Sequence, residues 1–340
     1  MSKLDKVTVI GTTTWGTTLG IILARKSHPV AILARTAEES SELEAERQNS
    51  RFLPGIEFPE SLRVSHDPQK ALRGAKMVIL AVPSRSFRDN VRRYQRAIEG
   101  EPIVLSVAKG LEMDTGKRMS QVLEDELPPR LHPKICVLSG PNLALEIVEG
   151  KPASTVVASK EHRVAAEAQE ILMSPYFRVY TNTDTIGVEL GGALKHIIAL
   201  GAGICDGLGY GDNGKAAFIT RGLAEITRLG VAAGASPITF AGLAGVGDLV
   251  ATCASRLSRN HFVGEQLAAG RPLKDILASM KNVAEGVYTT VAALKMAEEL
   301  GVEMPIARAT YQVLFEGLYP RQAVAELMAR PPRAEWEGIG

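Results

Sequence analysis

The chain has 340 residues, of which 45% are hydrophobic and 23% are charged. These proportions are typical of a folded globular protein and exclude wholesale disorder, and the length suits two domains better than a single core. Lys and Arg together number 39 while Asp and Glu number 38, so the chain lacks the basic surplus that would indicate nucleic acid or a membrane surface as a partner.

Cysteine usage and the apolar runs indicate a cellular compartment. Cys136, Cys205 and Cys253 make an odd number without the spacing of a metal site, which favours free thiols in a reducing environment. The first residues lack the apolar core of a signal peptide, and we identify no uninterrupted apolar run of about 18 residues. We therefore expect a cytoplasmic protein without a membrane span or a bound metal.

Short β-branched runs alternate with amphipathic segments in the first half of the chain. This alternation predicts a parallel sheet that is covered by helices on both faces. The predicted strands are 7–10, 30–33, 77–82, 103–107, 135–138, 154–158 and 177–180, and the predicted helices are 15–26, 37–48, 68–73, 87–98, 117–127 and 161–173.

The pattern changes near residue 185, where strand signals end and long segments with a period of 3.6 residues begin. This change predicts an all-helical second domain. We expect a first domain at 1–186 and a second at 187–340, joined at the polar stretch 181–185. The predicted helices are 187–205, 215–233, 259–269, 289–300, 306–317 and 321–329.

A glycine-containing turn follows the first predicted strand. Residues 11–16 (GTTTWG) occupy the place of the Gly-x-Gly-x-x-Gly turn of dinucleotide-binding domains, with Gly11 for the tight turn and Gly16 for close packing of the helix. Thr13 replaces the middle glycine, which normally lets the backbone approach a pyrophosphate. We expect a shifted or weaker phosphate contact, supported by N–H groups at the helix start and by threonine hydroxyls.

The second predicted strand ends near Arg35, without the acidic residue that usually binds the ribose 2′-hydroxyl of NAD. Arginine suits a 2′-phosphate or stacks on adenine, so Arg35 favours NADP over NAD. A solvated arginine at the start of a helix is the alternative.

Unusual residues also follow three later strands, at 83–84, 106–110 and 139–142. The carboxyl ends of strands form the ligand crevice of an open α/β sheet. Lys109 then places a cation at that crevice, suited to a phosphate or a carbonyl oxygen, although a surface lysine in a turn has the same pattern.

The segment 187–203 carries a lysine among small residues. At helical spacing, Lys195 shares a face with Gly191, Gly192, Ala199 and Ala202. Each interior glycine costs about 1 kcal/mol relative to alanine, so close helix packing or a bound ligand must use the space. Partial desolvation lowers the pKa of a lysine toward the value that an acid–base catalyst needs. Tight packing around a lysine that extends to solvent is the alternative.

A second polar cluster lies within residues 245–261. Ser258 suits a helix N-cap with Arg259 and Asn260 in the first turn, and such a helix start is a natural phosphate site. Asp248 can accept a hydrogen bond from a substrate hydroxyl or orient a lysine. Helix capping alone is the alternative.

In this order, the motifs resemble the bacterial NAD(P)-dependent glycerol-3-phosphate dehydrogenase family over nearly the whole chain. The segments that carry the resemblance are 15–16 (WG), 49–55 (NSRFLPG), 81–84 (AVPS), 108–110 (AKG), 139–141 (SGP), 192–195 (GALK), 206–209 (DGLG), 220–225 (TRGLAE), 245–248 (GVGD), 258–260 (SRN) and 284–286 (AEG).

The resemblance implies a Rossmann-like N-terminal domain and an all-α C-terminal domain of the 6-phosphogluconate-dehydrogenase-like type. It implies interconversion of sn-glycerol 3-phosphate and dihydroxyacetone phosphate with NADP or NAD, feeding phospholipid synthesis, by a homodimer. Lys195 matches the proton-transferring residue. The implied substrate contacts are Lys109, Gly140, Asn142, Lys195, Asp248, Ser258, Arg259 and Asn260. The implied cofactor contacts are Thr14, Trp15, Arg35, Lys109, Ala144, Arg259, Val283 and Glu285, to which the glycine turn adds Gly11, Thr13 and Gly16.

Two positions depart from the family pattern. The family turn is usually Gly-Ala-Gly-Ser-Trp-Gly, whereas this chain has Thr13 and Thr14 in place of the second glycine and the serine. The family lysine is normally followed by Asn, whereas this chain has His196, which a helix turns about 100° away from Lys195. We expect His196 to contact neighbouring groups.

Two other functions stay open at this stage. A related dehydrogenase of another small hydroxy substrate would share the nucleotide turn without needing a phosphate site at Arg259 and Asn260. A non-catalytic dinucleotide-binding or sensor protein could have lost tight cofactor binding through Thr13.

Overall fold

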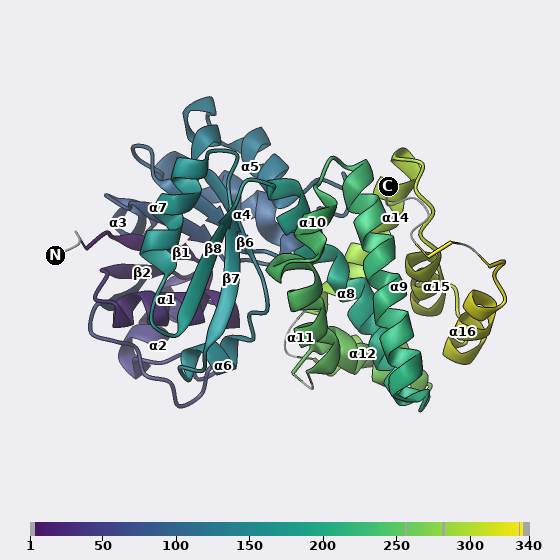
Figure 1. Ribbon diagram of the computed structural model, residues 1–340. Helices are drawn as coiled ribbons and strands as arrows, with labels where there is room; N and C mark the ends of the chain where they lie inside the picture. Colours follow the sequence, from purple (N-terminus) through teal and green to yellow (C-terminus); the bar gives the residue numbers. More distant parts are fainter. Residues whose placement is uncertain (1–3, 256, 281–282, 333, 336–340) are drawn as a thin grey trace. The chain divides into compact units, whose positions relative to one another are not determined.

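The computed structural model describes residues 4–255, 257–280, 283–332 and 334–335 (Figure 1). The chain divides into two compact units. The first consists of Met1–Ala108, Met119–Leu138 and Asn142–Thr185, and the second consists of Lys109–Arg118, Ser139–Pro141 and Ile186–Gly340. Two short segments that follow strands of the sheet, Lys109–Arg118 and Ser139–Pro141, therefore belong to the second unit. The predicted domain limits of 1–186 and 187–340 had placed both segments in the first domain.

An eight-stranded sheet forms the centre of the first unit, with the strand order β3-β2-β1-β4-β5-β6-β7-β8. The neighbours β1–β2, β1–β4, β2–β3, β4–β5, β5–β6 and β7–β8 pair in parallel. The strands are β1 (Val7–Ile10), β2 (Val30–Leu33), β3 (Leu62–Ser65), β4 (Met77–Leu80), β5 (Ile103–Ser106), β6 (Ile135–Ser139), β7 (Ala153–Ala158) and β8 (Phe177–Asn182).

Helices cover both faces of this sheet. They are α1 (Thr14–Arg25), α2 (Ala37–Glu46), α3 (Pro68–Leu72), α4 (Phe87–Tyr94), α5 (Met119–Glu126), α6 (Ala144–Val148) and α7 (His162–Leu172), with short 3₁₀ turns at Ser84–Ser86, Gln95–Ala97 and Pro129–Lys134. Along β1, Val7 and Val9 pack in one apolar cluster with α1 and α7, whereas Ile10 packs in another with α4 and α5. Since successive strand residues face opposite sides, both faces need apolar residues, and the predicted doubly covered parallel sheet is confirmed.

The second unit is helical and is built around α8 (Figure 1). One face of α8, with Leu194 and Ile198, packs in a cluster with α9, α11, α14 and α15, and Leu200 and Ile204 pack in a second cluster with α12, α13 and α16. The elements are α8 (Thr185–Gly207), α9 (Gly211–Ala232), α10 (Pro237–Phe240), a π-helical turn (Leu243–Gly247), α11 (Asp248–Ala254), α12 (Arg259–Ala268), α13 (Leu273–Ala278), α14 (Glu285–Glu299), α15 (Pro305–Phe315) and α16 (Pro320–Met328).

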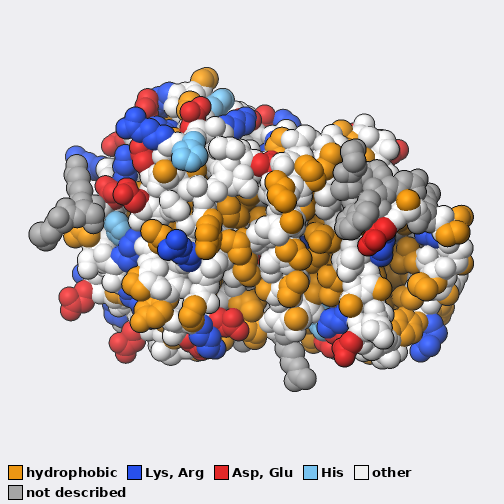
Figure 2. Space-filling model, in the orientation of Figure 1, with side chains coloured by type: hydrophobic (Ala, Val, Ile, Leu, Met, Phe, Trp, Pro, Cys, Tyr) orange, Lys and Arg blue, Asp and Glu red, His pale blue; other side chains and the backbone are white. Residues whose placement is uncertain are grey.

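A buried carboxylate links α9 to α15. Glu225 is 1% exposed, and its two carboxylate oxygens accept hydrogen bonds from the backbone N–H groups of Ile306 and Ala307, each at 2.8 Å. These N–H groups lie in the first turn of α15, where helices leave donors without intrahelical partners. Burial raises the pKa of Glu225 to about 7 despite these bonds. Glu225 also lines a cavity of about 1210 Å³. The face of the second unit seen in Figure 2 carries many hydrophobic side chains.

Two stretches are long and apolar enough to cross a membrane on length and composition alone, namely α8 and Pro237–Ala254. The sequence prediction overlooked them because it required an unbroken apolar run. However, 89% of the apolar window of α8 is buried inside the protein, and 44% of the other window is buried. A core helix passes the same test, so these stretches are weak evidence for a membrane span.

Short elements were the ones that the sequence did not predict. Strand β3 was missed, as were α6, α10, α11 and α13. In β3 the residues alternate between buried and solvent-facing positions, with Leu62 buried and Arg63 exposed, so it lacks the continuous apolar run of the central strands.

Candidate active site

Lys195 lies near the middle of α8 and is almost completely buried, with 4% of the whole residue exposed. A Cβ atom on Gly191 would lie 2.5 Å from the carbonyl oxygen of Ala244, and one on Gly192 would meet the hydroxyl of Ser139. Of the two explanations that the sequence left open, close packing therefore accounts for these glycines. Their small size draws α8 against the segments that carry the other polar groups of the site.

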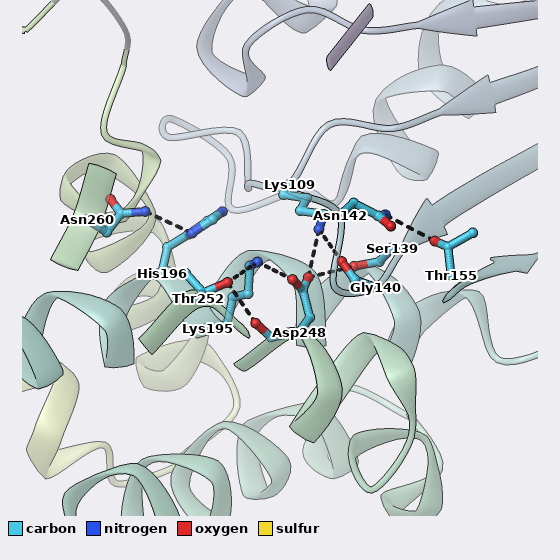
Figure 3. Close-up of polar contacts among 10 residues, drawn as sticks. All are labelled: Lys109, Ser139, Gly140, Asn142, Thr155, Lys195, His196, Asp248, Thr252 and Asn260. Atoms are coloured by element: carbon cyan, nitrogen blue, oxygen red, sulfur yellow. Dashed lines mark hydrogen bonds and ion pairs between the residues drawn. The ribbon is translucent and has the colours of Figure 1, made fainter. Parts of the chain in front are cut away.

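A turn of π-helix directs Asp248 inward. This turn, Leu243–Gly247, leads directly into α11, and Asp248 is the first residue of that helix. Gly245 lies so close to the carbonyl group of Phe240 that a side chain would have no room. Such π-turns are frequent at functional sites. The Asp248 carboxylate is 1% exposed and points toward Lys195 (Figure 3).

Asp248 joins two lysines (Figure 3). Nζ of Lys195 donates to Oδ1 of Asp248, and Nζ of Lys109 donates to Oδ2 at 2.7 Å. The Lys195 ammonium also donates to Oγ1 of Thr252 at 2.5 Å, and this hydroxyl donates to the Asp248 carbonyl oxygen at 2.7 Å. Lys109 further donates to the carbonyl oxygen of Gly140 at 2.7 Å. The second unit thus brings together residues that lie far apart in the sequence.

Charge and burial give this cluster its chemistry. Burial lowers the pKa of Lys195 from 10.5 to about 7, although Asp248 opposes the shift, and the nearby Lys109 lowers it further. One carboxylate is shared by two lysine side chains, so the cluster has more basic groups than acidic ones. Such an arrangement suits an anionic substrate and an amine that exchanges a proton near neutral pH.

His196 belongs to a separate hydrogen-bond chain. Its Nδ1 accepts from Nδ2 of Asn260 at 2.8 Å, because Oδ1 of Asn260 already accepts from the backbone N–H of Gly286 at 2.9 Å. Burial and the positive charges of Lys195, Lys109 and Arg259 lower the pKa of His196 well below 6.5. The imidazole is therefore neutral, with its proton on Nε2. The expectation that His196 contacts neighbouring groups agrees with this geometry.

The start of α12 has the predicted cap. Ser258 is the N-cap residue, and its hydroxyl accepts from the backbone N–H of His261 at 3.3 Å. Arg259 and Asn260 occupy the first turn, where Arg259 is exposed and Asn260 is buried. Glu285 at the start of α14 interacts electrostatically with Arg259. Val283 lies half-buried in the loop before α14.

The glycine turn of the first unit has the geometry that its sequence predicts. Gly11 has a φ of +113°, and a Cβ atom there would lie 2.7 Å from the carbonyl oxygen of Ala81. A Cβ atom on Gly16 would lie 2.5 Å from the Gly11 carbonyl oxygen. Both glycines are therefore required by close backbone packing between β1, α1 and the end of β4.

Thr13 takes a role that the sequence did not suggest. It is the N-cap of α1 with φ −65° and ψ 165°, a conformation open to any residue, so a glycine is not required there. Its hydroxyl accepts from the backbone N–H of Gly16 at 3.1 Å and donates to the carbonyl oxygen of Ala81 at 2.8 Å. The side chain is held by the protein, and the N–H groups of Thr14 and Trp15 in the first turn have no intrahelical acceptor.

Two buried polar atoms near this turn lack partners among the described residues, namely Nε1 of Trp15 and Oδ1 of Asn142. Nδ2 of Asn142 donates to Oγ1 of Thr155 at 3.0 Å, and Trp15 packs edge-on against Phe177. Ala144 begins α6 shortly after Asn142. Buried polar atoms without partners indicate a place for a polar ligand. The glycine turn, the start of α1 and Nε1 of Trp15 together fit a dinucleotide.

Two parts of this chain match models of a known family. The model described as the N-terminus of NAD-dependent glycerol-3-phosphate dehydrogenase matches residues 6–165, and the C-terminus model matches residues 184–325. The chain belongs to the NAD-dependent glycerol-3-phosphate dehydrogenase family. The resemblance drawn from the motifs is thereby confirmed.

Relatives in this glycerol-3-phosphate dehydrogenase family match almost end to end. The glycerol-3-phosphate dehydrogenase (NAD(P)+) of Dehalococcoides mccartyi is 52% identical over 336 residues, which is 98% of this chain and 94% of the relative. That of Chlorobium phaeobacteroides is 46% identical over 330 residues, covering 97% and 99%. The crystal structure of glycerol-3-phosphate dehydrogenase from Coxiella burnetii superimposes with a TM-score of 0.90 at 36% identity and covers 96% of this chain and 99% of that one.

Two residues of the cluster were not among the site residues expected from the glycerol-3-phosphate dehydrogenase motifs. Thr252 holds the Lys195 ammonium, and Ser139 donates from Oγ to Oδ2 of Asp248 at 3.4 Å. The spacing of four residues from Asp248 to Thr252 places both on one face of a helix and could have revealed Thr252. Ser139 stood in the motif 139–141 and at the end of a predicted strand, but its contact with Asp248 had no local signal, because only the fold brings Ser139 to Asp248.

Proposed function

We propose that this protein interconverts dihydroxyacetone phosphate and sn-glycerol 3-phosphate by hydride transfer at C2, with NADH or NADPH as coenzyme. The observation that carries the proposal is the buried Lys195 ammonium, which Asp248 and Thr252 hold in place and whose pKa is lowered to about 7. When bound, the coenzyme supplies the hydride, and every other part of the step falls to the side chains of this chain.

Lys195 is the acid of this proposal. During reduction its ammonium donates a proton to the C2 oxygen as the carbonyl becomes an alcohol, and during oxidation the neutral amine removes that proton. An unperturbed lysine with a pKa near 10.5 is a weak acid and is almost never neutral at pH 7, so burial suits Lys195 to both directions. Asp248 positions the ammonium through Oδ1 and balances its charge.

Charge recognition falls to the remaining cations. Lys109 is 15% exposed and keeps a hydrogen bond to Asp248, which leaves its ammonium available to a polar group of the substrate. Arg259 at the start of α12 and Asn260 beside it form the phosphate site, where a helix N-terminus and a guanidinium both favour an anion. Gly140, Asn142 and Ser258 complete the substrate contacts of the proposal.

The dinucleotide is held by the first unit in this proposal. The N–H groups of Thr14 and Trp15 bind the pyrophosphate at the start of α1. Gly11, Thr13 and Gly16 shape the turn. Arg35, which is exposed just beyond the end of β2, lies at the adenosine end. Ala144, Val283 and Glu285 are further coenzyme contacts. A homodimer in the cytoplasm that supplies the glycerol backbone of phospholipids completes the proposal, and sedimentation of the purified chain tests the dimer.

A steady-state assay tests the proposed reaction. Dihydroxyacetone phosphate and unphosphorylated dihydroxyacetone are compared with NADH and with NADPH. We expect kcat/KM for the phosphorylated ketone to be higher by about 100-fold or more, because charge-assisted hydrogen bonds to the phosphate are lost without it. Equal rates for both ketones would favour another small hydroxy substrate. Tight coenzyme binding without turnover would favour a sensor.

A further inference from the structure

The carboxylate of Glu39 and the guanidinium of Arg93 both contact the backbone of Arg35, just beyond the end of β2 in the first unit. Glu39, in the first turn of α2, accepts a hydrogen bond at Oε1 from Oγ1 of Thr12 at 2.6 Å. Its other oxygen, Oε2, accepts from the backbone N–H of Arg35 at 3.0 Å. The carboxylate of Glu39 is thereby fixed between the glycine turn and the residue that follows β2.

Arg93 approaches the same corner from α4. Its Nη2 donates to the carbonyl oxygen of Arg35 at 3.3 Å, and its guanidinium lies 5.3 Å from the ring centre of Tyr94. Arg35 itself is exposed. One residue, Arg35, therefore has a carboxylate at its N–H group and a guanidinium at its carbonyl group.

This corner is where a dinucleotide-binding fold discriminates between coenzymes. The adenosine ribose lies outside the carboxyl ends of the first two strands, where an acidic residue binds the 2′-hydroxyl of NAD and an arginine binds the 2′-phosphate of NADP. The sequence reading found only Arg35 here and favoured NADP. Glu39 escaped it because it lies four residues further on, and Arg93 escaped it because only the fold brings α4 to β2.

We propose that Glu39 accepts a hydrogen bond from the ribose 2′-hydroxyl of NADH and that Arg93, together with Arg35, binds the 2′-phosphate of NADPH. The inference rests on the proposed function, since it names the residues that choose between its two coenzymes. A carboxylate offers about four acceptor positions, so Glu39 can accept from a ribose hydroxyl while it keeps its bonds to Thr12 and Arg35. Its negative charge repels a 2′-phosphate, which the guanidinium groups attract.

Helix capping alone does not explain the position of Glu39. Thr36 is the N-cap of α2, and its hydroxyl accepts from the backbone N–H of Glu39 at 3.2 Å. In a capping box, the glutamate three residues after the cap returns to the N–H of the cap residue itself. Here the carboxylate instead reaches Arg35 and Thr12, which places it between the glycine turn and the end of β2.

Binding of two coenzyme fragments to the full-length protein tests the inference without requiring turnover. The probes are adenosine 2′,5′-bisphosphate and AMP, measured by calorimetry at low salt. The variants are Glu39→Gln and Arg93→Gln. The matched controls are Glu38→Gln, an exposed neighbour in the same turn of α2, and Arg92→Gln, whose guanidinium faces Glu126 of α5 instead. Thermal unfolding verifies that each variant is folded.

Opposite changes are expected from the two variants. Glu39→Gln should strengthen binding of the bisphosphate about tenfold, because a charge repulsion is removed, and should weaken binding of AMP. Arg93→Gln should weaken binding of the bisphosphate about tenfold and leave AMP unchanged. The controls should leave the ratio of the two dissociation constants within twofold of wild type.

Other results would overturn the inference. If Glu39→Gln changes the two dissociation constants by the same factor, Glu39 has only a capping role. If Arg93→Gln leaves the dissociation constant of the bisphosphate unchanged, Arg93 does not reach the 2′ position. This test remains valid even if Glu39→Gln fails to fold. If the wild-type protein reduces dihydroxyacetone phosphate but both variants keep the wild-type preference between NADH and NADPH, this inference alone is refuted. Wild-type protein that binds neither fragment nor either coenzyme refutes the proposed function as well.

Discussion

The ammonium of Lys195 and the carboxylate of Asp248 form an ion pair inside the second unit, with 5% and 1% of their side chains exposed. The same carboxylate serves Lys109 through its other oxygen at 2.7 Å. An ion pair so deeply buried contributes little net stability, because desolvation of both charges offsets their attraction. Its value is positional, since it fixes an amine of lowered pKa at one point of the site.

Replacing the carboxylate tests this positional role. In Asp248→Asn, two ammonium groups lose their shared counter-charge, so we expect kcat for reduction to fall about 100-fold or more. The free energy of unfolding should fall by about 3 kcal/mol, because buried charge is left uncompensated. Asp212→Asn, an exposed change in α9, is the control and should alter neither quantity. Wild-type kcat in Asp248→Asn would show that Asp248 does not position Lys195.

The lowered pKa of Lys195 predicts opposite pH profiles for the two directions. Reduction requires the protonated amine, so its kcat/KM should fall as the pH rises through about 7. Oxidation requires the neutral amine, so its kcat/KM should rise over the same interval and level off above it. The measurement is kcat/KM from steady-state rates between pH 5.5 and pH 9.5 at saturating coenzyme. Profiles without an inflection below pH 9 in either direction would contradict a desolvated Lys195.

His196 should remain neutral throughout the physiological range. Its pKa is lowered well below 6.5, and Asn260 donates to its Nδ1, which leaves no room for a second proton there. Nitrogen-15 NMR of labelled protein should therefore show the Nε2–H tautomer at pH 6. A titration midpoint near 6.5 would contradict this account.

Substitution of the same residue should separate a structural from a chemical role. His196→Asn keeps an acceptor for Asn260 and should retain activity within about threefold, because the chain of hydrogen bonds to Gly286 survives. His196→Leu leaves the Asn260 amide without that partner and should lower the free energy of unfolding by about 1–3 kcal/mol. Chemical denaturation and kcat are measured together, and equal stability of the two variants would refute the assigned hydrogen-bond chain.

Stability of the second unit also depends on Glu225. In Glu225→Ala, two buried N–H groups at the start of α15 lose their acceptor, so the free energy of unfolding should fall by about 2–4 kcal/mol while kcat of the folded protein is unchanged. Glu298→Ala, an exposed change near the end of α14, is the matched control. A loss below about 0.5 kcal/mol in Glu225→Ala, the usual range of surface changes, would contradict the capping role.

Local sequence signals were sufficient wherever the physics is local. The central strands were predicted because a strand buried on both faces needs an unbroken apolar run, as in Val7–Ile10 and Met77–Leu80. Ser258 was predicted as a cap because a hydroxyl before a helix satisfies an N–H group whatever the fold. The stripe of small residues on α8 correctly singled out Lys195 as unusual.

Tertiary contacts set the rest. The small size of Gly191 and Gly192 did not reveal whether a ligand or another segment fills the space, and the structure shows that Ala244 and Ser139 do. The sequence suggested that the side chain of Thr13 hinders phosphate binding. In the structure its hydroxyl instead caps α1, and a hydrogen bond to the carbonyl oxygen of Ala81 holds it in that orientation. Sequence spacing carries no information about such partners, because they come from segments that are distant in the chain.

Turnover by Lys195→Met measures the central claim most directly, since this change removes the amine and keeps an unbranched side chain in the same space. The Kd of NADH and NADPH should stay within about threefold of wild type, whereas kcat for dihydroxyacetone phosphate should fall by about 100-fold to 10,000-fold, the usual contribution of a general acid. A Lys195→Met protein that binds coenzyme normally and keeps kcat within tenfold of wild type would contradict the assignment of Lys195 as the proton donor.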